Sequence, residues 1–439
     1  MARIDNLSNF LTDVATAIKE KKGDNTPILA SEFDTEITNL PSGGGIVSKK
    51  LKDINFFDYD GTCLYSYTME EFASVTELPP LPERDGFTYT QWNWTLSDIK
   101  GENSPVDVGA QCITSDGWSR VYIDLGDLRC DPYFALGVNG TVEVDWGDGS
   151  PTQTMTNTNA NQTKLYHKFA TGGKYIIKFK PISGYVTISG NDSGTAGSRL
   201  LSKVSSTSND TSNMVYAESI YKIELGENVQ ITSCGCKNLH NLESINLPDS
   251  STIGNPTWGF YGCSNLKFVS FPSGMTNLKQ NIFQSAGIER MSLPKSCTFM
   301  LGYGVYQTPG LSVLRVPSQF TGFGSRAFQY CQLLRLVIPE KVTSISTYVF
   351  YDMYRCESLK FLGDVTKIEA YNFSNCYALL EIDLSNCTSV PTIATSNVFT
   401  SVDSACKVIV PDELYDTWIA DANWSAHANR IIKHSDYYI

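Results

Sequence analysis

A repeat of 22 to 24 residues runs from about residue 220 to 411 and largely determines the fold that this chain can adopt. A strand-like phrase ending on proline recurs in it, closing at Pro248, Pro272, Pro294, Pro317 and Pro339. An independent aromatic marker keeps the same period at Phe260, Phe283, Tyr306, Phe328, Phe350 and Phe373. A period of this length indicates one strand and one return segment per coil, so the region predicts a solenoid stabilised by stacking of its coils.

The repeating template is L-x-x-φ-x-φ-P, where φ is an apolar residue, and about eight coils follow it, some imperfectly. The phrases FYGCSNL (260–266), VTSISTYVF (342–350) and VTKIEAYNFSNCYAL (365–379) resemble the BspA-type leucine-rich repeat. The resemblance implies a leucine-rich-repeat solenoid over residues 214–411. That family includes adhesins and other surface proteins, so the resemblance is specific for fold and not for function.

Residues 412–439 predict a C-terminal helical cap, because a solenoid must cover the apolar end of its last coil. Tyr415, Trp418 and Trp424 are the side chains expected to cover it.

Residues 1–45 predict two short helices and a glycine-rich joint. Their apolar faces are formed by Leu7, Phe10, Leu11, Val14 and Ile18 in the first helix and by Phe33 and Ile37 in the second. The pair resembles leader segments at the start of tail-associated proteins of phages and prophages of Firmicutes. The resemblance implies a segment that attaches the chain to other virion proteins. A helix folded back on the chain's own β-domain is the alternative.

Residues 46–119 predict a β-grasp-like module. Asp60-Gly61 lies between two aromatic, β-branched runs, which is a strong hairpin signal. The phrase ELPPLPERDGFTYTQWNW (77–94) resembles the end of the Listeria–Bacteroides repeat, a small module of surface proteins. The sequence departs from that pattern by continuing into WTLSDIK.

Residues 120–213 predict a β-sandwich of two sheets. In TVEVDWGDGS (141–150) and LYHKFATGGKYIIKFK (165–180), apolar residues alternate along the chain. The two phrases resemble the PKD-type Ig-like domain, and His167 is expected in the core beside Trp146. The predicted fold class is therefore mainly β and multidomain, with short N-terminal helices, β-grasp-like and Ig-like modules, a solenoid and a helical cap.

Composition argues against several classes of function. The chain has 46 acidic and 34 basic residues and a net charge of −12, so it lacks the basic stripe of a nucleic-acid-binding protein. No run approaches the ~20 apolar residues of a membrane-spanning helix. The first residues lack the continuous apolar region of a signal peptide, so synthesis in a cytoplasm is expected, with no membrane insertion. Twelve cysteines are expected to be reduced, since Cys263, Cys331, Cys356 and Cys376 occupy corresponding points of successive coils.

Motifs for catalysis are missing from the sequence. None of the four histidines pairs with a nucleophile or carboxylate in a recognisable phrase. Asp145 and Asp148 do not have the spacing of an EF-hand loop, and Cys234-Gly-Cys236 has no second ligand pair at zinc-finger spacing. No catalytic residue, cofactor or metal is predicted, although a carboxylate pair for glycoside hydrolysis could be recognised only from geometry.

Two surfaces of the solenoid are predicted to bind a ligand. On the sheet face, Arg290, Arg315 and Arg335 would form a basic strip for an acidic polymer, or belong to a mixed solvated surface. The return loops carry tyrosines that could stack on sugars, or be core residues in the case of Tyr348 and Tyr371. The tyrosines predicted as ligand-binding are Tyr261, Tyr303, Tyr330, Tyr351 and Tyr354.

Taken together, these segments predict a virion protein, most simply a tail-associated receptor-binding or fibre-like adhesin. Its expected partners are other virion proteins and a host cell-surface glycan or protein, and a homo-oligomer is left open. A head decoration or stalk component, and an exported bacterial adhesin, are the alternatives.

Overall fold

The computed structural model describes residues 51–126, 130–190, 198–203, 214–248, 257–394 and 397–437. The chain divides into one unit of residues 1–51 and a second of residues 52–439. The apolar residues predicted to attach the chain to a particle lie outside the described residues; they are Leu7, Phe10, Leu11, Val14, Ile18, Phe33 and Ile37.

The second unit begins with a four-stranded mixed sheet, here called the first sheet, in the order β2-β1-β4-β3. Its strands are β1 (Ile54–Phe57), β2 (Cys63–Tyr67), β3 (Phe87–Trp92) and β4 (Val106–Thr114), and its short helices are α3 (Met69–Ala73) and α4 (Leu96–Lys100). β1 pairs antiparallel with β2 and parallel with β4. The predicted hairpin at Asp60-Gly61 is confirmed, with Gly61 at φ +90°. Phe56, Phe72 and Trp92 lie in a hydrophobic core that belongs to this sheet.

An eight-stranded sheet follows, where the sequence predicts two packed sheets. Its strands are β5 (Ser119–Leu125), β6 (Tyr133–Asp145), β7 (Gln153–Tyr166), β8 (Gly173–Ile188), β9 (Leu201–Ser202), β10 (Ile220–Glu224), β11 (Val229–Ile231) and β12 (Ser244–Ile245), with α5 (Met214–Ala217) before β10. The difference arises because β10, the first solenoid strand, pairs antiparallel with β5. The hydrogen-bonded ladder therefore continues from this sheet into the solenoid.

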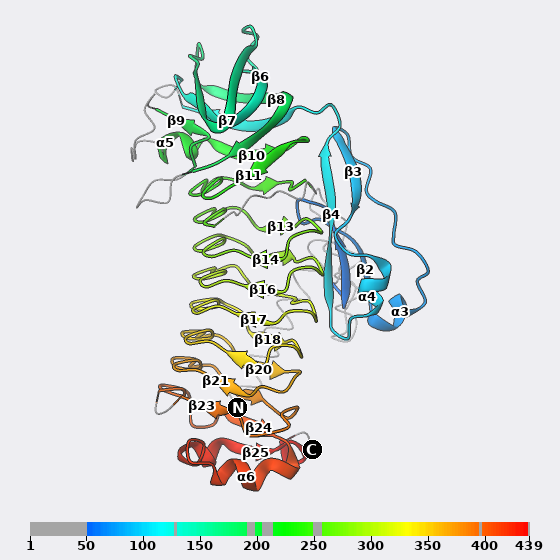
Figure 1. Ribbon diagram of the computed structural model, residues 1–439, viewed down its shortest axis with the longest axis vertical. Helices are drawn as coiled ribbons and strands as arrows, with labels where there is room; N and C mark the ends of the chain where they lie inside the picture. The colour runs from blue at the N-terminus through cyan, green and yellow to red at the C-terminus, as the bar shows by residue number, and fades with distance from the viewer. Residues whose placement is uncertain are drawn as a thin grey trace, which may run out of the picture. The chain divides into compact units, whose positions relative to one another are not determined.

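The solenoid has about nine turns, and its strands are only two to four residues long after β11. One side carries β13 (Phe268–Ser270), β15 (Arg290–Ser292), β18 (Arg335–Ile338), β20 (Ser358–Phe361), β22 (Glu381–Asp383), β24 (Lys407–Val410) and β25 (Ile431–Lys433). A second side carries β14 (Asn277–Leu278), β16 (Phe299–Met300), β17 (Gly322–Phe323), β19 (Ser344–Ile345), β21 (Lys367–Ile368) and β23 (Thr392–Ile393). All these pairs are parallel, and Figure 1 shows the coils stacked between β11 and β25.

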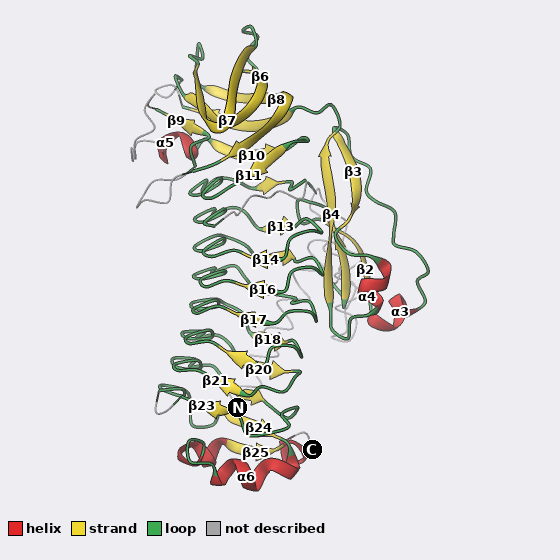
Figure 2. Cartoon of the chain, viewed as in Figure 1, coloured by secondary structure: helices red, strands yellow, loops and turns green. Residues whose placement is uncertain are grey.

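The last coil is covered by η3 (Asp412–Leu414), α6 (Tyr415–Ala420), η4 (Ser425–Arg430) and α7 (His434–Tyr437). Trp418 and Trp424 are fully buried, and the indole Nε1 of Trp424 donates to the carbonyl of Pro391 at 2.7 Å. The described helices are short, as Figure 2 shows, so the protein is mainly β with little helix.

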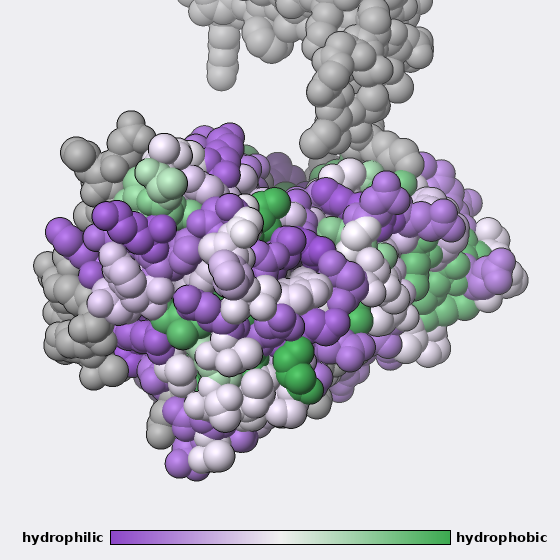
Figure 3. All heavy atoms as spheres, turned by 90° about the horizontal axis from the view of Figure 1, so that it is seen from above, coloured by the Kyte–Doolittle hydropathy of each residue, from purple (hydrophilic) through white to green (hydrophobic). Residues whose placement is uncertain are grey.

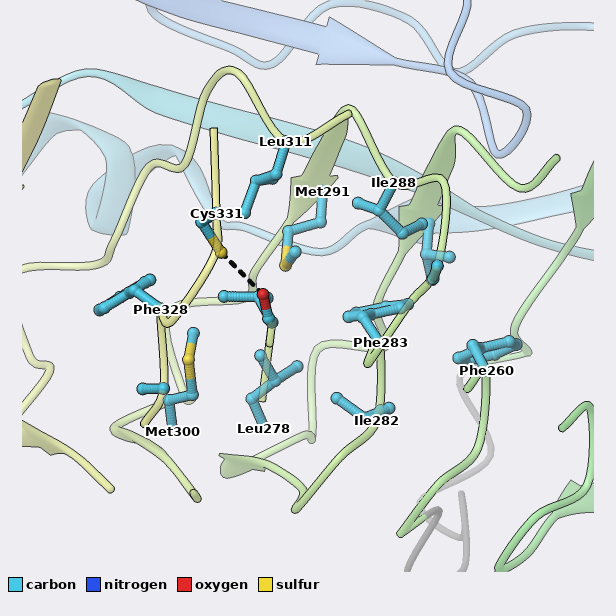
Figure 4. Packing of buried hydrophobic residues seen from close by; sticks show 14 of the residues in the cluster. Phe260, Leu278, Ile282, Phe283, Ile288, Met291, Met300, Leu311, Phe328 and Cys331 are labelled. Carbon is cyan, nitrogen blue, oxygen red and sulfur yellow. Dashed lines mark hydrogen bonds between the residues drawn. The ribbon is translucent and has the colours of Figure 1, made fainter. Parts of the chain in front are cut away.

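One hydrophobic core runs through the eight-stranded sheet, the solenoid and the cap. Within it, aromatic rings stack from coil to coil: Phe328 lies 5.9 Å from Phe350, with the ring planes 7° apart. Figure 4 shows Phe260 beside Phe283, with Phe328 two coils further along the same core. Because each coil covers the apolar residues of the next, burial along the stack supplies most of the stabilisation.

Candidate binding surfaces of the solenoid

Most return loops turn through two residues in the left-handed conformation, four positions apart. Tyr348 and Asp352 have φ of 62° and 57°, and Tyr371 and Asn375 have φ of 62° and 60°. Non-glycine residues adopt this region rarely, so its recurrence reflects a turn that stacking imposes on every coil. The turn places the residue that lies two positions after the first left-handed residue, such as Phe350, in the core. It leaves Tyr348 and Tyr371 half-buried on the outer side of the loop, whereas Asp352 is buried.

This turn corrects the predicted register of one coil. The sequence places Tyr306 in line with Phe283 and Phe328, but the buried residue at that point is Val305. Main-chain bonds confirm the equivalence, since Phe283 donates to Gly304 and Val305 donates to Ala327 at 3.2 Å. Coils of 22 and 23 residues alternate, so the equivalent core residue can shift by one position from coil to coil. Tyr306 therefore lies on the outer surface of the loop.

The cysteine column is also corrected at one member. Cys263, Cys331 and Cys376 are equivalent, and each thiol donates to a core carbonyl of the preceding coil. Cys331, for example, donates to Val305 at 2.7 Å and also contacts the Thr308 hydroxyl at 3.1 Å. In the coil between Cys331 and Cys376, the residue equivalent to these cysteines is Met353, and Cys356 lies three residues further along the chain. The ladder of small thiols is therefore interrupted at this coil. All twelve cysteines are thiols, and burial raises the pKa of Cys331 to about 12.

Six tyrosines from four successive coils form one outer array, here called the tyrosine surface. They are Tyr303, Tyr306, Tyr330, Tyr348, Tyr351 and Tyr371, all half-buried except Tyr330, which is exposed. The ring of Tyr306 lies 5.3 Å from Tyr303 and 5.6 Å from Tyr330. Tyr348 stacks on Tyr371 at 4.6 Å with the planes 2° apart. These contacts hold the rings in fixed orientations, and Tyr330 is the member of the array most exposed to solvent.

Arg326 joins the two halves of the tyrosine surface. Its guanidinium lies 4.3 Å from the ring centre of Tyr348, a cation–π geometry, and donates to the Gln329 side chain at 2.9 Å. Gln329 donates in turn to Asp352 at 3.0 Å, and Asn375 donates to the other oxygen of Asp352 at 2.8 Å. A polar row of four side chains therefore runs along the array from coil to coil.

The charge of Asp352 also affects the phenols beside it. Burial, and then the carboxylate of Asp352, raise the pKa of Tyr330 and of Tyr351 above the usual value. Both phenols therefore keep their protons at neutral pH and can donate hydrogen bonds to a ligand.

The other two predicted tyrosines lie apart from this array. Tyr261 packs on Trp258 at 5.1 Å, and Lys237 lies over both rings. The coil between Tyr261 and Tyr303 has Asn281 and Gln284 at the corresponding positions, so no aromatic ring connects them. Tyr354 is 40% exposed beside Gln332, at the edge where the return loops meet the sheet face.

The predicted arginine strip is divided by the first sheet. Asp107 on β4 pairs with Arg290 at 2.5 Å and with Nε of Arg315 at 3.3 Å. Arg315 also donates to the main-chain carbonyl of Lys52 at 2.7 Å. Arg335 is exposed and does not take part in this network. The structure therefore brings Arg290 and Arg315 together at one carboxylate and leaves Arg335 separate.

The first sheet lies against the sheet face of the solenoid through buried polar contacts. Asn93 donates to the carbonyl of Phe271 and to the hydroxyl of Ser292, both at 2.9 Å. The indole of Trp94 donates to the carbonyl of Leu293 at 2.8 Å. β4 runs beside these coils in Figure 1. The outward residues of coils 268–316 are thus covered by the chain itself.

The WGDG turn is held by its own side chains. His167 stacks on Trp146 with ring centres 4.4 Å apart, which confirms the predicted position of this histidine, and its Nε2 lies 2.7 Å from Asp148. Asp145 is 3.2 Å from the Lys178 ammonium. Among the described residues, no three His, Cys, Asp or Glu side chains are grouped to hold a metal ion.

The end of the unit that carries β6–β8 presents a mixed surface. Figure 3 looks down on it and shows hydrophilic residues with hydrophobic ones between them. Ile182 on β8 and Tyr166 on β7 are exposed large hydrophobic side chains, at 58% and 47%. None of the helices that the structure describes is long and apolar enough to cross a membrane.

Of the six residues of the tyrosine surface, Tyr303, Tyr330 and Tyr351 were predicted from the sequence as ligand-binding; the polar row of Arg326, Gln329, Asp352 and Asn375 was not. The signal in the sequence was the spacing of these residues. Gln329 follows Arg326 by three residues, and Asp352 and then Asn375 follow at steps of 23 residues, which is the coil period. The contacts of Asp107 had no comparable signal in the sequence.

Comparison with known proteins agrees with the repeat. Residues 229–357 and 300–417 match the family described as BspA type leucine-rich repeat region, in six copies. Residues 229–417 thus form a BspA-type leucine-rich repeat solenoid. No curated protein matches it closely enough to count as a relative.

Three solved structures are similar to parts of this chain. A leucine-rich repeat protein of T. pallidum (TpLRR) is 21% identical with a TM-score of 0.33, covering 45% of this chain and 86% of that one. One from Bacteroides ovatus is 15% identical with a TM-score of 0.27, covering 55% and 96%. A leucine-rich cell surface protein from Faecalibacterium prausnitzii is 15% identical with a TM-score of 0.26, covering 58% and 84%.

Proposed function

We propose that this protein is an adhesin of a phage virion, attached to the particle by residues 1–45, which binds a host cell-surface glycan. The proposal that the ligand is a glycan rests on the tyrosine surface with its polar row. The virion part rests on the resemblance of the N-terminal segment to leaders of tail-associated proteins.

The chemistry of the tyrosine surface fits sugar rings. A pyranose has an apolar C–H face and an equatorial rim of hydroxyls, so it pairs with an aromatic ring flanked by hydrogen-bonding groups. Tyr348 and Tyr371 form a stacked pair, and the half-buried Asn375 offers an amide beside them, while the buried Gln329 holds Asp352 in place. Rings already fixed by neighbours lose little conformational entropy on binding.

Electrostatics favour a neutral glycan on this surface. Arg326 is engaged with Tyr348 and Gln329, while the Asp352 carboxylate accepts from Gln329 and Asn375. One positive and one negative charge therefore lie in the same row, so no excess charge attracts a polyanion.

The sheet face supports the same choice of surface. In many solenoids the strands line an extended binding face. Here Asp107, Asn93 and Trp94 engage that face on coils 268–316. These coils of the sheet face are therefore occupied by the chain itself, and the return loops of the tyrosine surface are not.

The test of glycan binding uses the full chain, fluorescently labelled, on intact cells and purified cell wall of candidate Gram-positive hosts. Replacing both Tyr348 and Tyr351 by alanine should weaken saturable binding by about tenfold or more, since each stacking contact contributes roughly 1 kcal/mol. The matched control is Tyr166→Ala, which removes a tyrosine 47% exposed on β7. Equal binding by the double variant and the control would contradict the proposal.

The virion part is tested separately by mass spectrometry and antibody labelling of purified particles induced from a lysogen that carries the gene. Labelling at the tail tip supports the adhesin, and labelling on the head would indicate a decoration protein. Presence on the bacterial surface without particles would indicate an exported adhesin instead.

A further inference from the structure

The strand ladder on the sheet side of the solenoid is interrupted at residues 313–316. β15 pairs with β13 and β18 pairs with β20, and the described coil between them forms no strand. The coils remain stacked behind the interruption, since the Phe328 N–H donates to the carbonyl of Val349 at 3.1 Å and the Phe328 ring stacks on Phe350. The interruption is therefore a depression in the sheet face and not an opening into the core.

A cavity of about 170 Å³ lies at this depression. Its apolar wall is formed by Leu314 and Val316 of the coil without a strand, by Val337 on β18 and by Leu362 on the coil after it. An apolar cavity of about 150 Å³ holds a benzene ring. The space here therefore accepts one six-membered ring with its substituents.

Four polar side chains around the cavity have no side-chain hydrogen bond or ion pair within the part of the chain that the structure describes. Asn103 and Ser104 follow α4 on the first sheet, and Arg335 and Glu340 belong to the solenoid. By contrast, the cations of the neighbouring coils pair with carboxylates of the first sheet. A concave apolar wall with a few uncommitted polar groups around it is the usual form of a small-molecule site.

Two opposite charges at the cavity determine which charge a ligand can carry. Arg335 is exposed, and its guanidinium can pair with both oxygens of a carboxylate. Glu340 follows β18 and lines the same cavity, so it repels a second negative charge such as that of a phosphate dianion. A ligand with a single carboxylate is therefore favoured.

We propose that this cavity binds a hexuronic acid residue, a sugar that bears one carboxylate on a pyranose ring. Arg335 and Val337 are two positions apart on β18, and side chains at that spacing project from the same side of a strand, about 7 Å apart. The carboxylate of the sugar pairs with Arg335, while the apolar C–H face of its ring lies against Val337 and Leu314.

The hydroxyls of the ring distinguish a sugar from an aromatic or aliphatic acid. The Asn103 amide and the Ser104 hydroxyl donate and accept hydrogen bonds, and the Glu340 carboxylate accepts them, so the three complement hydroxyl groups. A benzoate or a fatty acid displaces water from these side chains without replacing its hydrogen bonds, which lowers affinity. The site uses the sheet side of the solenoid, so it goes beyond the glycan proposed for the tyrosine surface and does not depend on it.

The test is a saturation-transfer NMR titration of the full chain with methyl β-D-glucuronide. Saturable binding is expected, and methyl β-D-glucoside should bind about tenfold or more weakly, because it lacks the carboxylate and its charge-assisted hydrogen bonds. Arg335→Gln and Val337→Asp should each weaken glucuronide binding by a similar factor. Both residues are exposed, so the variants should fold, which circular dichroism checks. The control is Arg355→Gln, which removes another exposed arginine and should leave binding unchanged.

Four outcomes would overturn the proposal: no saturation by the glucuronide, equal affinity for the glucoside, equal affinity of Arg335→Gln, or benzoate binding as tightly as the glucuronide. Unchanged glucuronide binding by the Tyr348→Ala, Tyr351→Ala variant is expected, and its loss would assign the acidic sugar to the tyrosine surface instead. If that variant also binds cells normally, the glycan proposed for the tyrosine surface is contradicted while the uronate site stands.

Discussion

The carboxylate of Asp107 on β4 accepts a hydrogen bond from Arg290 on β15 at 2.5 Å, across 183 residues of sequence. Its other oxygen accepts from the Asn55 amide at 3.0 Å and faces Nε of Arg315. The carboxylate is 1% exposed, so a single buried anion compensates two guanidinium groups. This arrangement fixes where the first sheet docks and explains why two predicted ligand-binding arginines are engaged within the chain.

Replacing Asp107 by asparagine should therefore destabilise the docked sheet. The amide keeps the shape but leaves two guanidinium groups uncompensated, and breaking such a pair costs about 3 kcal/mol or more. The urea midpoint, followed by circular dichroism, should fall clearly below that of the parent protein. Glu289→Gln is the control, because the Lys267–Glu289 pair is 55% exposed on both sides and contributes within about 0.5 kcal/mol. Equal midpoints for the two variants would contradict this role of Asp107.

Gly109 should not tolerate a side chain. A Cβ there would lie 2.0 Å from the hydroxyl of Ser270, 2.8 Å from its Cβ and 3.1 Å from the Cβ of Ser292. Gly109→Ala therefore forces β4 away from the coils, with an expected loss of about 1–3 kcal/mol in the free energy of unfolding.

Two further variants make the Gly109 result specific. Gly274→Ala, where nothing lies within 4 Å of the added carbon, should leave the urea midpoint nearly unchanged. Adding Ser270→Gly to Gly109→Ala should recover part of the loss, since it removes the two closest atoms. A fully stable Gly109→Ala protein would mean that β4 is not pressed against these coils.

Features with a local or periodic cause could be predicted from the sequence. The coil repeat, the hairpin at Asp60-Gly61 and the stacking of His167 on Trp146 all depend on residues close together or regularly spaced. The period is not strict, however: the aromatic marker includes Tyr306, but the buried residue of that coil is Val305.

Contacts between distant segments could not be predicted. Asn93 and Ser292 are 199 residues apart, and neither residue type indicates which residue it will contact. The same holds for Asp107 with Arg290 and Arg315, so the arginines were expected in one open strip. The continuous eight-stranded sheet was missed because β5 finds its partner β10 about 100 residues later, where the repeat alone predicts a coil.

The buried cysteines should resist alkylation while the protein is folded. Burial raises the pKa of Cys236, Cys297 and Cys331 to about 12, so almost no thiolate forms at pH 8. Iodoacetamide should modify Cys63 and Cys130, the two half-exposed cysteines, and all twelve only after denaturation. Mass spectrometry of the native and denatured reactions provides the measurement. Rapid native labelling at Cys331 would mean that the coils open locally.

The bond between Asp148 and His167 should make the stability of the eight-stranded sheet depend on pH in the acid range. Burial alone would raise the pKa of Asp148, but hydrogen bonds from Ser150 and His167 outweigh it and lower that pKa to about 2. A carboxylate with a depressed pKa in the folded state stabilises the fold above its unfolded value of about 4. That contribution is lost as the pH falls from about 4 toward 2.

Asp148→Asn should accordingly lower the free energy of unfolding at pH 7 by about 1 kcal/mol, a figure reduced for the solvent that reaches this turn. The difference between variant and parent should shrink as the pH falls from 4 to 2, because the parent then loses the same charge. Asp124→Asn, which changes an exposed carboxylate on β5, should show no such convergence. Urea titrations at pH 7, 4 and 2 measure all three proteins. A difference that grows on acidification would assign the stabilising charge to another group, because the sign for Asp148 allows only a decrease.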